Sequence, residues 1–380
     1  MGPLAGIKVI ELAGIGPGPM CAMLLADLGA TVLRIDRVQP VDQGNWRPLK
    51  YDLRLRGRKS IALDLKKLAA VDLVLKLVKR ADALTEGFRP GVTERLGLGP
   101  EACLAHNPKL VYGRVTGWGQ TGPLASSVGH DINYIAITGA LNAIGRYGQP
   151  PTPPLNLLGD YAGGSLYLAL GLLAGIIEAR QSGRGQVVDA AIVDGTASLM
   201  TSIFGLYAGG LMNLERGTNA TDSGAYFYDV YQCADGRWIS IGPIENRFHA
   251  ELLRLLEIDP ADIGNQKNRT NWPTARAILA QRFKTRTRDE WTALLEGTDA
   301  CFAPVLGMDE APKHPHLQAR GTFVEVDGVV QPAPAPRFSR TVPEVPTPPQ
   351  QITRDNTGTA LTAWIEPDEI AALRAAGTLF

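Results

Sequence analysis

The sequence has few cysteines and no surplus of charge, and both shortages limit what the chain can be. Only four cysteines occur in 380 residues, and they lie too far apart for a disulfide framework or a zinc ribbon. The 38 basic and 38 acidic residues cancel, whereas a general nucleic-acid binder needs a strongly basic face. We therefore expect reduced thiols, a cytoplasmic location, no metal site and no nucleic-acid partner.

A long hydrophobic run and a leader-like N-terminus are also missing. The membrane-like stretch at residues 165–177 is shorter than the roughly 20 residues that span a bilayer. Asp160 precedes this stretch, Glu178 follows it, and the stretch itself contains glycines. The first residues do not have the profile of a signal peptide. The sequence therefore predicts a buried helix and no membrane span.

The first half of the chain alternates between strands and helices. Residues 7–12 and 31–35 have the composition of buried strands, and the segment between them has helical apolar spacing at 20–28. Such a βαβ unit predicts a parallel sheet. The pattern continues with strands at 61–65, 83–86 and 110–116, helices at 68–79, 133–144 and 166–179, and a mixed segment at 187–193.

Near residue 225 the character of the sequence changes. Residues 228–242 alternate around an Ala-Asp-Gly turn at 234–236, which predicts a hairpin. Helical segments are expected at 251–256, 274–283, 289–295 and 366–375, and the seven prolines of residues 331–350 predict an extended arm. These patterns predict a large α/β domain over 1–195, a linker at 196–224, a smaller α+β domain at 225–328, and a Pro-rich return arm with a C-terminal helix at 329–380.

The turn after the first strand has glycines at positions 14, 16 and 18. A dinucleotide fingerprint needs the spacing G-x-G-x-x-G, and Pro19 occupies the place of the third glycine. Asp36 lies where a ribose-binding acid would lie, but Arg34 and Arg37 beside it suit a phosphate better. A tight strand–helix connection, a backbone approach site for a ligand and an NAD site all remain open.

Several arginines lie next to the predicted strands. Arg37 follows the second strand and Arg58 precedes the third, while Arg89 and Arg95 occupy a Gly/Pro-rich loop after the strand at 83–86. Arginines that follow strands of one parallel sheet can converge on a polyphosphate at its carboxyl edge. The alternative for each arginine is solvated surface charge.

Two polar residues stand beside apolar helices. His130 lies between Gly129 and Asp131, just before the predicted helix at 133–144, and histidine can act as a general base or acid near neutral pH. Asp160 begins the apolar helix, among glycines that would let a substrate approach the backbone closely. For both residues, the alternative is a structural helix cap.

A series of short motifs runs through nearly the whole chain. The segments read VIELAGIGPGP at 9–19, RIDR at 34–37, GFRPGVTERLGLG at 87–99, TGWGQTGP at 116–123, GHDINY at 129–134, NLLGD at 156–160, GRGQVVD at 183–189, CADG at 233–236 and PAPRFSR at 334–340. In content and order these motifs resemble the α-methylacyl-CoA racemases, which belong to the family III CoA-transferases.

The resemblance implies a Rossmann-like large domain, a smaller α+β domain, and two chains interlocked as a homodimer with shared active sites. The substrate would be an acyl-CoA thioester, and because its CoA moiety is part of the substrate, no separate cofactor is required. His130 and Asp160 match the two racemase bases, and Glu245 matches a glutamate that the partner subunit places near the histidine. The CoA-binding residues expected on this basis are Arg37, Arg58, Arg89, Arg95, Gly129, Asp131 and Tyr134.

The implied reaction inverts C2 of a 2-methylacyl-CoA by 1,1-proton transfer through an enolate. His130 and Asp160 would act on opposite faces, and Glu245 would orient His130. Backbone N–H groups at 159–161 would hold the enolate oxygen. The main alternative is a CoA transferase in which Asp160 attacks the thioester and forms a mixed anhydride. His130 favours the racemase, because the transfer route does not need a histidine there.

Two other classes of protein fit the residues less well. A non-catalytic acyl-CoA-binding protein would not need both candidate bases, and an NAD oxidoreductase would need the fingerprint that Pro19 interrupts. Two features depart from the racemase pattern. Residues 43–56 look longer than usual and carry Trp46 and Tyr51, and the six methionines are few for a methionine-rich acyl surface. The acyl-chain preference therefore stays open.

Overall fold

A computed structural model describes residues 1–39 and 47–379 of the chain. Unit 1 comprises Met1–Thr138, Leu155–Leu199 and Gly321–Phe380, and unit 2 comprises Gly139–Pro154 and Met200–Arg320. The boundaries expected from the sequence therefore differ from these units at three places: residues 139–154 group with unit 2, the predicted linker divides after Leu199, and residues 321–328 group with unit 1. The part of the long 43–56 segment that includes Trp46 lies outside the described residues.

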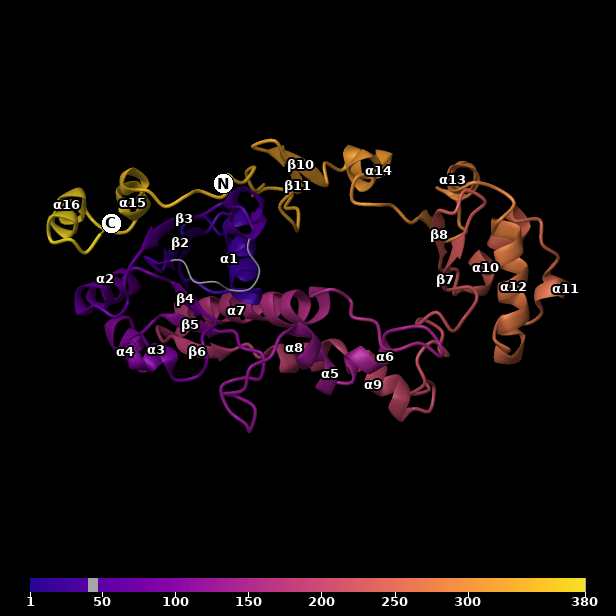
Figure 1. Ribbon diagram of the computed structural model, residues 1–380, viewed down its shortest axis with the longest axis horizontal. Coiled ribbons are helices and arrows are strands. Elements are labelled where there is room, and N and C mark those ends of the chain that lie inside the picture. The colour runs from indigo at the N-terminus through magenta and orange to yellow at the C-terminus, as the bar shows by residue number, and fades with distance from the viewer. Residues whose placement is uncertain (40–46, 380) are drawn as a thin grey trace. The chain divides into compact units, whose positions relative to one another are not determined.

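A six-stranded sheet forms the centre of unit 1, and neighbouring strands in it run parallel. The strand order is β3-β2-β1-β4-β5-β6, so the direction of winding reverses between β1 and β4 (Figure 1). This order is that of the Rossmann fold. The strands are β1 Lys8–Leu12, β2 Thr31–Asp36, β3 Lys59–Ala62, β4 Ala83–Glu86, β5 Val111–Arg114 and β6 Gln186–Asp189.

Helices cover both faces of this sheet because its strands are apolar on both sides. On one face, α1 and α7 bury Cys21, Leu25, Leu168 and Leu172 against the strands. On the other face, α2 packs together with the C-terminal helices, and α15 lies along β3 (Figure 1). The helices of unit 1 are α1 Pro17–Asp27, η1 Leu49–Tyr51, η2 Leu53–Leu55, α2 Leu68–Val78, α3 Val92–Arg95, α4 Pro100–His106, α5 Asp131–Ile137, η3 Leu157–Leu166, α7 Tyr167–Ser182, α8 Ile192–Leu199, α15 Arg354–Leu361 and α16 Pro367–Ala375.

A buried ion pair fastens the returning C-terminal part of the chain to unit 1. The guanidinium of Arg56 donates to both carboxylate oxygens of Asp27, at 3.1 and 2.6 Å. The same group donates to Gln331 Oε1 at 2.9 Å and to the Pro332 carbonyl at 2.7 Å. Gln331 and Pro332 belong to the hairpin of β10 (Phe323–Val326) and β11 (Val329–Pro332). No helix or strand is found from 333 to 353, as the prolines predict.

Unit 2 has its own antiparallel sheet and its own core. The sheet order is β7-β8-β9, and β7 and β8 form the hairpin predicted at 228–242. Large aromatic residues, among them Phe283 and Trp291, are fully buried in this core. The elements of unit 2 are α6 Ala140–Ala143, α9 Thr201–Ala208, β7 Asp229–Gln232, β8 Trp238–Ile241, α10 Asn246–Leu255, α11 Pro260–Ile263, η4 Arg269–Asn271, α12 Trp272–Phe283, α13 Arg288–Leu295, β9 Phe302–Pro304, η5 Ala311–Lys313 and α14 Pro315–Ala319.

Several predicted helices have different limits in the structure, and the helix predicted at 251–256, for example, extends over Asn246–Leu255. The first helix of the chain begins at Pro17 instead of residue 20, because proline is well tolerated in the first turn of a helix. The helix predicted at 133–144 is two short helices that meet at the Thr138–Gly139 boundary between the units. The apolar helix begins nine residues early as the π-helix η3, which continues directly into α7.

The combined helix from Leu157 to Ser182 is the one described segment long and apolar enough to cross a membrane, judged by length and composition only. It packs against β5 and β6 and contributes Leu168, Leu172 and Ile176 to the core of unit 1. Part of its apolar surface is thus used within the α/β unit, while Leu166, Leu170 and Ile177 are exposed.

Candidate active site

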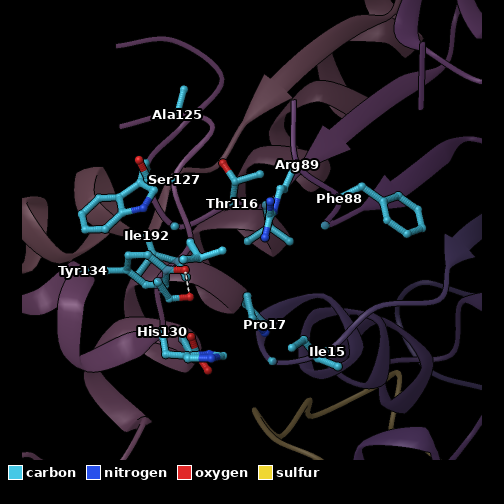
Figure 2. A pocket seen from close by; sticks show the side chains of 18 of the residues that line it. Ile15, Pro17, Phe88, Arg89, Thr116, Ala125, Ser127, His130, Tyr134 and Ile192 are labelled. Atoms are coloured by element: carbon cyan, nitrogen blue, oxygen red, sulfur yellow. Dashed lines mark hydrogen bonds between the residues drawn. The ribbon is translucent and has the colours of Figure 1, made fainter. Parts of the chain in front are cut away.

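A pocket opens in unit 1 at the carboxyl edge of the parallel sheet. Its walls come from the segments that follow β1, β4 and β5, which flank the point where the strand order reverses. Ligands of open α/β sheets bind at such a point. The pocket has a volume of about 370 Å³, and its lining includes Gly16, Arg89, Thr116, His130 and Asp160 (Figure 2).

His130 is both a helix cap and a pocket residue, so its two interpretations do not exclude each other. It is the N-cap of α5, where its N–H donates to Asn133 Oδ1 at 3.0 Å. The N–H of Asn133 in turn donates to the His130 carbonyl at 2.8 Å. The residue is exposed and lines the pocket. Its backbone is therefore fixed while its ring faces the space where a ligand would lie.

Asp160 lies inside the π-helix η3, four residues after the cap residue Asn156. It is not the N-cap that the structural alternative required. Asn156 Nδ2 donates to Asp160 Oδ2 at 3.3 Å, and the Asp160 N–H donates to Asp131 Oδ1 at 2.6 Å. π-helical turns occur frequently at functional sites. The wide turn holds the Asp160 carboxylate among the residues that line the pocket.

The pKa of the Asp160 carboxyl lies above its ordinary value. Burial is the main cause, and the negative charge of Asp131 acts in the same direction. The hydrogen bond from Asn156 and the charges of His130 and Arg54 oppose this increase. A carboxyl group with a raised pKa is available in both protonation states nearer neutral pH, as a proton-transfer group needs.

Gly16 explains the glycine-rich turn after β1. Its φ is +63°, and a Cβ there would lie 3.1 Å from Asp160 Oδ2. The turn therefore makes the tight connection into α1 and also brings the backbone close to a pocket carboxylate. The interpretation as a tight strand–helix connection is therefore confirmed, and the approach of a ligand to this backbone stays a prediction.

The four candidate phosphate-binding arginines have different surroundings. Arg89 is exposed and lines the pocket. Arg37 lines a neighbouring pocket, and its Cζ lies 5.9 Å from the ring centre of Phe88. Arg95 is exposed at the end of α3. Arg58 corrects the sequence-based expectation: its side chain is fully buried, pairs with Glu11 and donates to the Pro19 carbonyl at 2.9 Å. Its charge thus compensates a buried carboxylate inside the sheet.

Asp131 supports the site from behind, whereas Tyr134 lines the pocket itself. The Asp131 side chain is buried and receives the N–H of Asp160, while the Tyr134 hydroxyl donates to the Gly129 carbonyl. The expectation that backbone N–H groups at 159–161 hold the enolate oxygen is corrected by these contacts. The Asp160 N–H is used by Asp131, and the Tyr161 N–H donates to the Asn156 carbonyl at 3.3 Å.

Glu245 lies in unit 2, outside the residues that line this pocket. It is the exposed N-cap of α10, and its carbonyl accepts the His249 N–H at 2.9 Å. Its carboxylate helps raise the pKa of the Cys301 thiol, for which burial is the main cause. No group of three or more metal-ligating side chains is found among the described residues.

Sequence reasoning did not single out Trp118 or Asn156, and both take part in the site. Trp118 lines the pocket, and its ring packs edge-on against Tyr134 with 4.8 Å between ring centres. Asn156 donates to Asp160. The i, i+4 spacing of Asn156 and Asp160 on one helical turn is the signal that points to this pair.

Similar proteins match nearly the whole chain. The family model described as CoA-transferase family III matches residues 4–355. The chain is 44% identical over 345 residues to the α-methylacyl-CoA racemase of Mus musculus, covering 90% of this chain and 88% of that protein. It is 42% identical over 346 residues to the Homo sapiens α-methylacyl-CoA racemase, with the same coverage. A solved structure of a CAIB/BAIF family protein from Brucella suis has a TM-score of 0.81 at 25% identity and covers 99% of both chains.

Proposed function

The chain belongs to CoA-transferase family III, and from that premise we propose that it interconverts the (2R) and (2S) forms of 2-methylacyl-CoA thioesters. The observation that carries the proposal is that His130 and Asp160, two groups able to transfer protons, line one pocket at the sheet edge. The two relatives named α-methylacyl-CoA racemase, at 44% and 42% identity, support the same reaction. The enzyme is on this basis an isomerase.

The thioester carbonyl acidifies the C2 hydrogen, because the charge left at C2 delocalises onto the oxygen. Inversion needs a base on one face of C2 and an acid on the other. A neutral His130 removes the proton from one enantiomer while a protonated Asp160 delivers a proton to the opposite face. The raised pKa of Asp160, caused chiefly by burial, favours that protonated form. In the reverse direction the two residues exchange roles.

The enolate oxygen needs donors that are not already used. Because the Asp160 and Tyr161 N–H groups have acceptors, and the Asn133 and Tyr134 N–H groups donate to the His130 carbonyl, we assign this role to the Asp131 and Ile132 N–H groups at the start of α5. The first N–H groups of a helix have no carbonyl partner within the helix. Donors aimed at a developing oxyanion stabilise it strongly in a site that excludes water.

The CoA moiety is part of the substrate, and 1,1-proton transfer consumes no other cofactor. We propose that the exposed side chains of Arg37, Arg89 and Arg95 hold its phosphates, while Gly129 borders the thioester. Guanidinium groups suit phosphates because they can donate two parallel hydrogen bonds. Arg58 is left out of this set because it is buried against Glu11.

We also propose a homodimer in which Glu245 of one chain approaches His130 of the other. Support comes from α7 and the turn before it, where Leu166, Leu170 and Ile177 are 52%, 63% and 59% exposed. Apolar rows of this kind usually mark an interface. The four free cysteines are compatible with a cytoplasmic location, which we propose as well.

The test is to incubate one enantiomer of 2-methyldecanoyl-CoA with the enzyme in heavy water. Deuterium entry at C2 with loss of optical purity is the expected result, and His130→Ala or Asp160→Ala should each slow racemisation by about 10²–10⁴-fold. The absence of both exchange and racemisation, across several chain lengths, would refute the proposal.

The second candidate is CoA transfer, which the description of the matching family favours. In that reaction the Asp160 carboxylate attacks the thioester carbonyl and expels the CoA thiolate, leaving a mixed anhydride. Hydroxylamine would then trap an acyl group on Asp160, and CoA would pass to an added carboxylate. Racemisation without such trapping excludes this route.

A further inference from the structure

We propose that Tyr134 is a positioning residue for His130. It acts by binding the carbonyl of Gly129, the residue directly before His130. The inference rests on the proposed function, because it assigns His130 a role in proton transfer. It differs from the CoA-binding role that the resemblance to the racemases implied for Tyr134.

The backbone of His130 is held on its C-terminal side by α5. Its N–H is bound to Asn133 Oδ1, and its carbonyl accepts the N–H groups of Asn133 and Tyr134 at 2.8 and 3.3 Å. On the N-terminal side, residues 115–130 form neither a helix nor a strand. Regular structure therefore does not fix the peptide that precedes His130.

The Tyr134 hydroxyl supplies a second restraint on the Gly129–His130 peptide, whose N–H is held by Asn133 Oδ1. It donates to the Gly129 carbonyl, so one side chain of α5 reaches back and binds the residue just before His130 (Figure 2). Burial raises the pKa of Tyr134 to about 12, and the nearby Asp160 carboxylate adds to the increase. The hydroxyl therefore stays protonated and remains a donor throughout the physiological pH range.

The Tyr134 ring is itself held between close neighbours. The Trp118 ring meets it edge-on at 86°. A Cβ at Gly129 would lie 2.8 Å from Tyr134 Cε1, and a Cβ at Gly117 would overlap the ring. Because glycine occupies both positions, the ring lies directly against the two backbone segments. It has little freedom to turn the hydroxyl away from the Gly129 carbonyl.

The consequence is a fixed starting point for the His130 side chain. A base must be within hydrogen-bonding reach of the proton that it removes, and a displacement of about 1 Å can cost roughly 10²-fold in rate. Losing the Tyr134 hydroxyl should therefore affect the steps that His130 performs. Asp160 has separate supports, Asn156 at its carboxylate and Asp131 at its backbone N–H, and its steps should change far less.

The experiment uses Tyr134→Phe, which keeps the ring and removes the hydroxyl. Deuterium exchange at C2 is measured from each pure enantiomer of 2-methyldecanoyl-CoA, and His130→Ala identifies the enantiomer whose proton His130 removes. We expect exchange from that enantiomer to fall at least tenfold at saturating substrate with KM changed less than threefold. Exchange from the other enantiomer should stay within threefold of the wild-type rate.

Tyr167→Phe is the matched control, because it removes a hydroxyl that binds Ser198 outside the pocket lining. It should leave both exchange rates unchanged. Gly129→Ala is the second variant: its Cβ would press on the Tyr134 ring. Because Gly129 also borders the thioester, this variant is judged only by the ratio of the two exchange rates, which should show the same unequal loss. This variant keeps the test decisive if Tyr134→Phe folds poorly.

Equal losses for both enantiomers, a rise in KM alone, or no change would each overturn the proposal. If the wild-type enzyme exchanges neither enantiomer, the proposed function fails, and the inference is then judged without turnover. In that case the rate at which diethyl pyrocarbonate modifies His130 is followed by mass spectrometry. A rate at least threefold different in Tyr134→Phe supports the positioning role, and an unchanged rate refutes it.

Discussion

Replacing Asp131 by asparagine would reveal how strongly the Asp160 turn depends on its carboxylate neighbour. Asp131 is 6% exposed, and its Oδ1 accepts the Asp160 N–H at 2.6 Å. Burial raises the pKa of the Asp131 carboxyl, and the neighbouring Asp160 and Gly159 N–H groups oppose this increase. Asparagine keeps the size of the side chain, but it offers the Asp160 N–H a neutral amide oxygen in place of a charged carboxylate oxygen.

The structure sets the size of the expected loss. A hydrogen bond to a charged partner contributes about 1.5–3 kcal/mol. If that free energy is lost from the catalytically competent geometry, exchange should slow by roughly 10- to 160-fold, at about 1.36 kcal/mol per factor of ten. The KM for the thioester should change little, because Asp131 lies behind the pocket wall.

The same substitution has a second effect with a defined sign. The Asp131 charge helps raise the pKa of Asp160, so removing that charge lowers the pKa. For the enantiomer whose proton Asp160 removes, the acidic limb of the pH–rate profile should move to lower pH. For the opposite direction, in which Asp160 must be protonated, activity should be lost at a lower pH than in the wild type.

Exchange rates from both enantiomers, measured between about pH 5 and 9, would show these effects. Asp259→Asn is the control, because that exposed carboxylate also accepts a backbone N–H, from Ala261 at 2.8 Å, but in unit 2. A rate within threefold of wild type together with unshifted limbs would refute the reasoning.

Three further predictions concern Gly16, Arg56 and His249. Gly16→Ala should reduce the free energy of unfolding by about 1–2 kcal/mol because φ is +63°. It should also lower kcat without raising KM, because the new Cβ would lie 3.1 Å from the Asp160 carboxylate. Urea unfolding and enzyme kinetics would measure the two effects. Arg56→Met should reduce the unfolding free energy by about 3–5 kcal/mol because it leaves Asp27 buried without a partner, and adding Asp27→Leu should restore much of the loss. Burial lowers the pKa of His249 below its ordinary value of 6.5, so the unfolded chain takes up a proton first as pH falls, and unfolding free energy should decrease below about pH 6.5. His249→Gln should remove that decrease, and an unchanged pH dependence in urea titrations would contradict it.

The parts of the fold that depend on short-range patterns were predictable. The strand–helix–strand unit of β1, α1 and β2 and the hairpin of β7 and β8 are each set by neighbouring residues, so periodicity and turn composition identify them. The strand order was not predictable from such patterns. It depends on which strand lies beside β1, and β4 takes that place on its free side.

The site was predictable in its residues and less so in its contacts. Motif content identified His130 and Asp160, which line one pocket. The sequence does not reveal that Arg58 pairs with Glu11, because those residues are 47 positions apart and only the folded sheet brings them together. The same holds for the bond between Asp160 and Asp131, 29 positions apart, which takes away the N–H expected to serve the enolate.

The way in which unit 1 is assembled from separate stretches has a consequence for biosynthesis. Lys59 at the edge of the sheet donates to the Thr359 carbonyl of α15, 300 residues later. At about 5–20 residues translated per second, α15 is synthesised roughly 15–60 s after β3. Throughout this interval the apolar face that holds Ile61 and Leu63 lacks Leu361 and Trp364, which complete its core. Unit 1 therefore reaches its final form only near the end of translation, and chains that stop before α15 should depend on chaperones or aggregate.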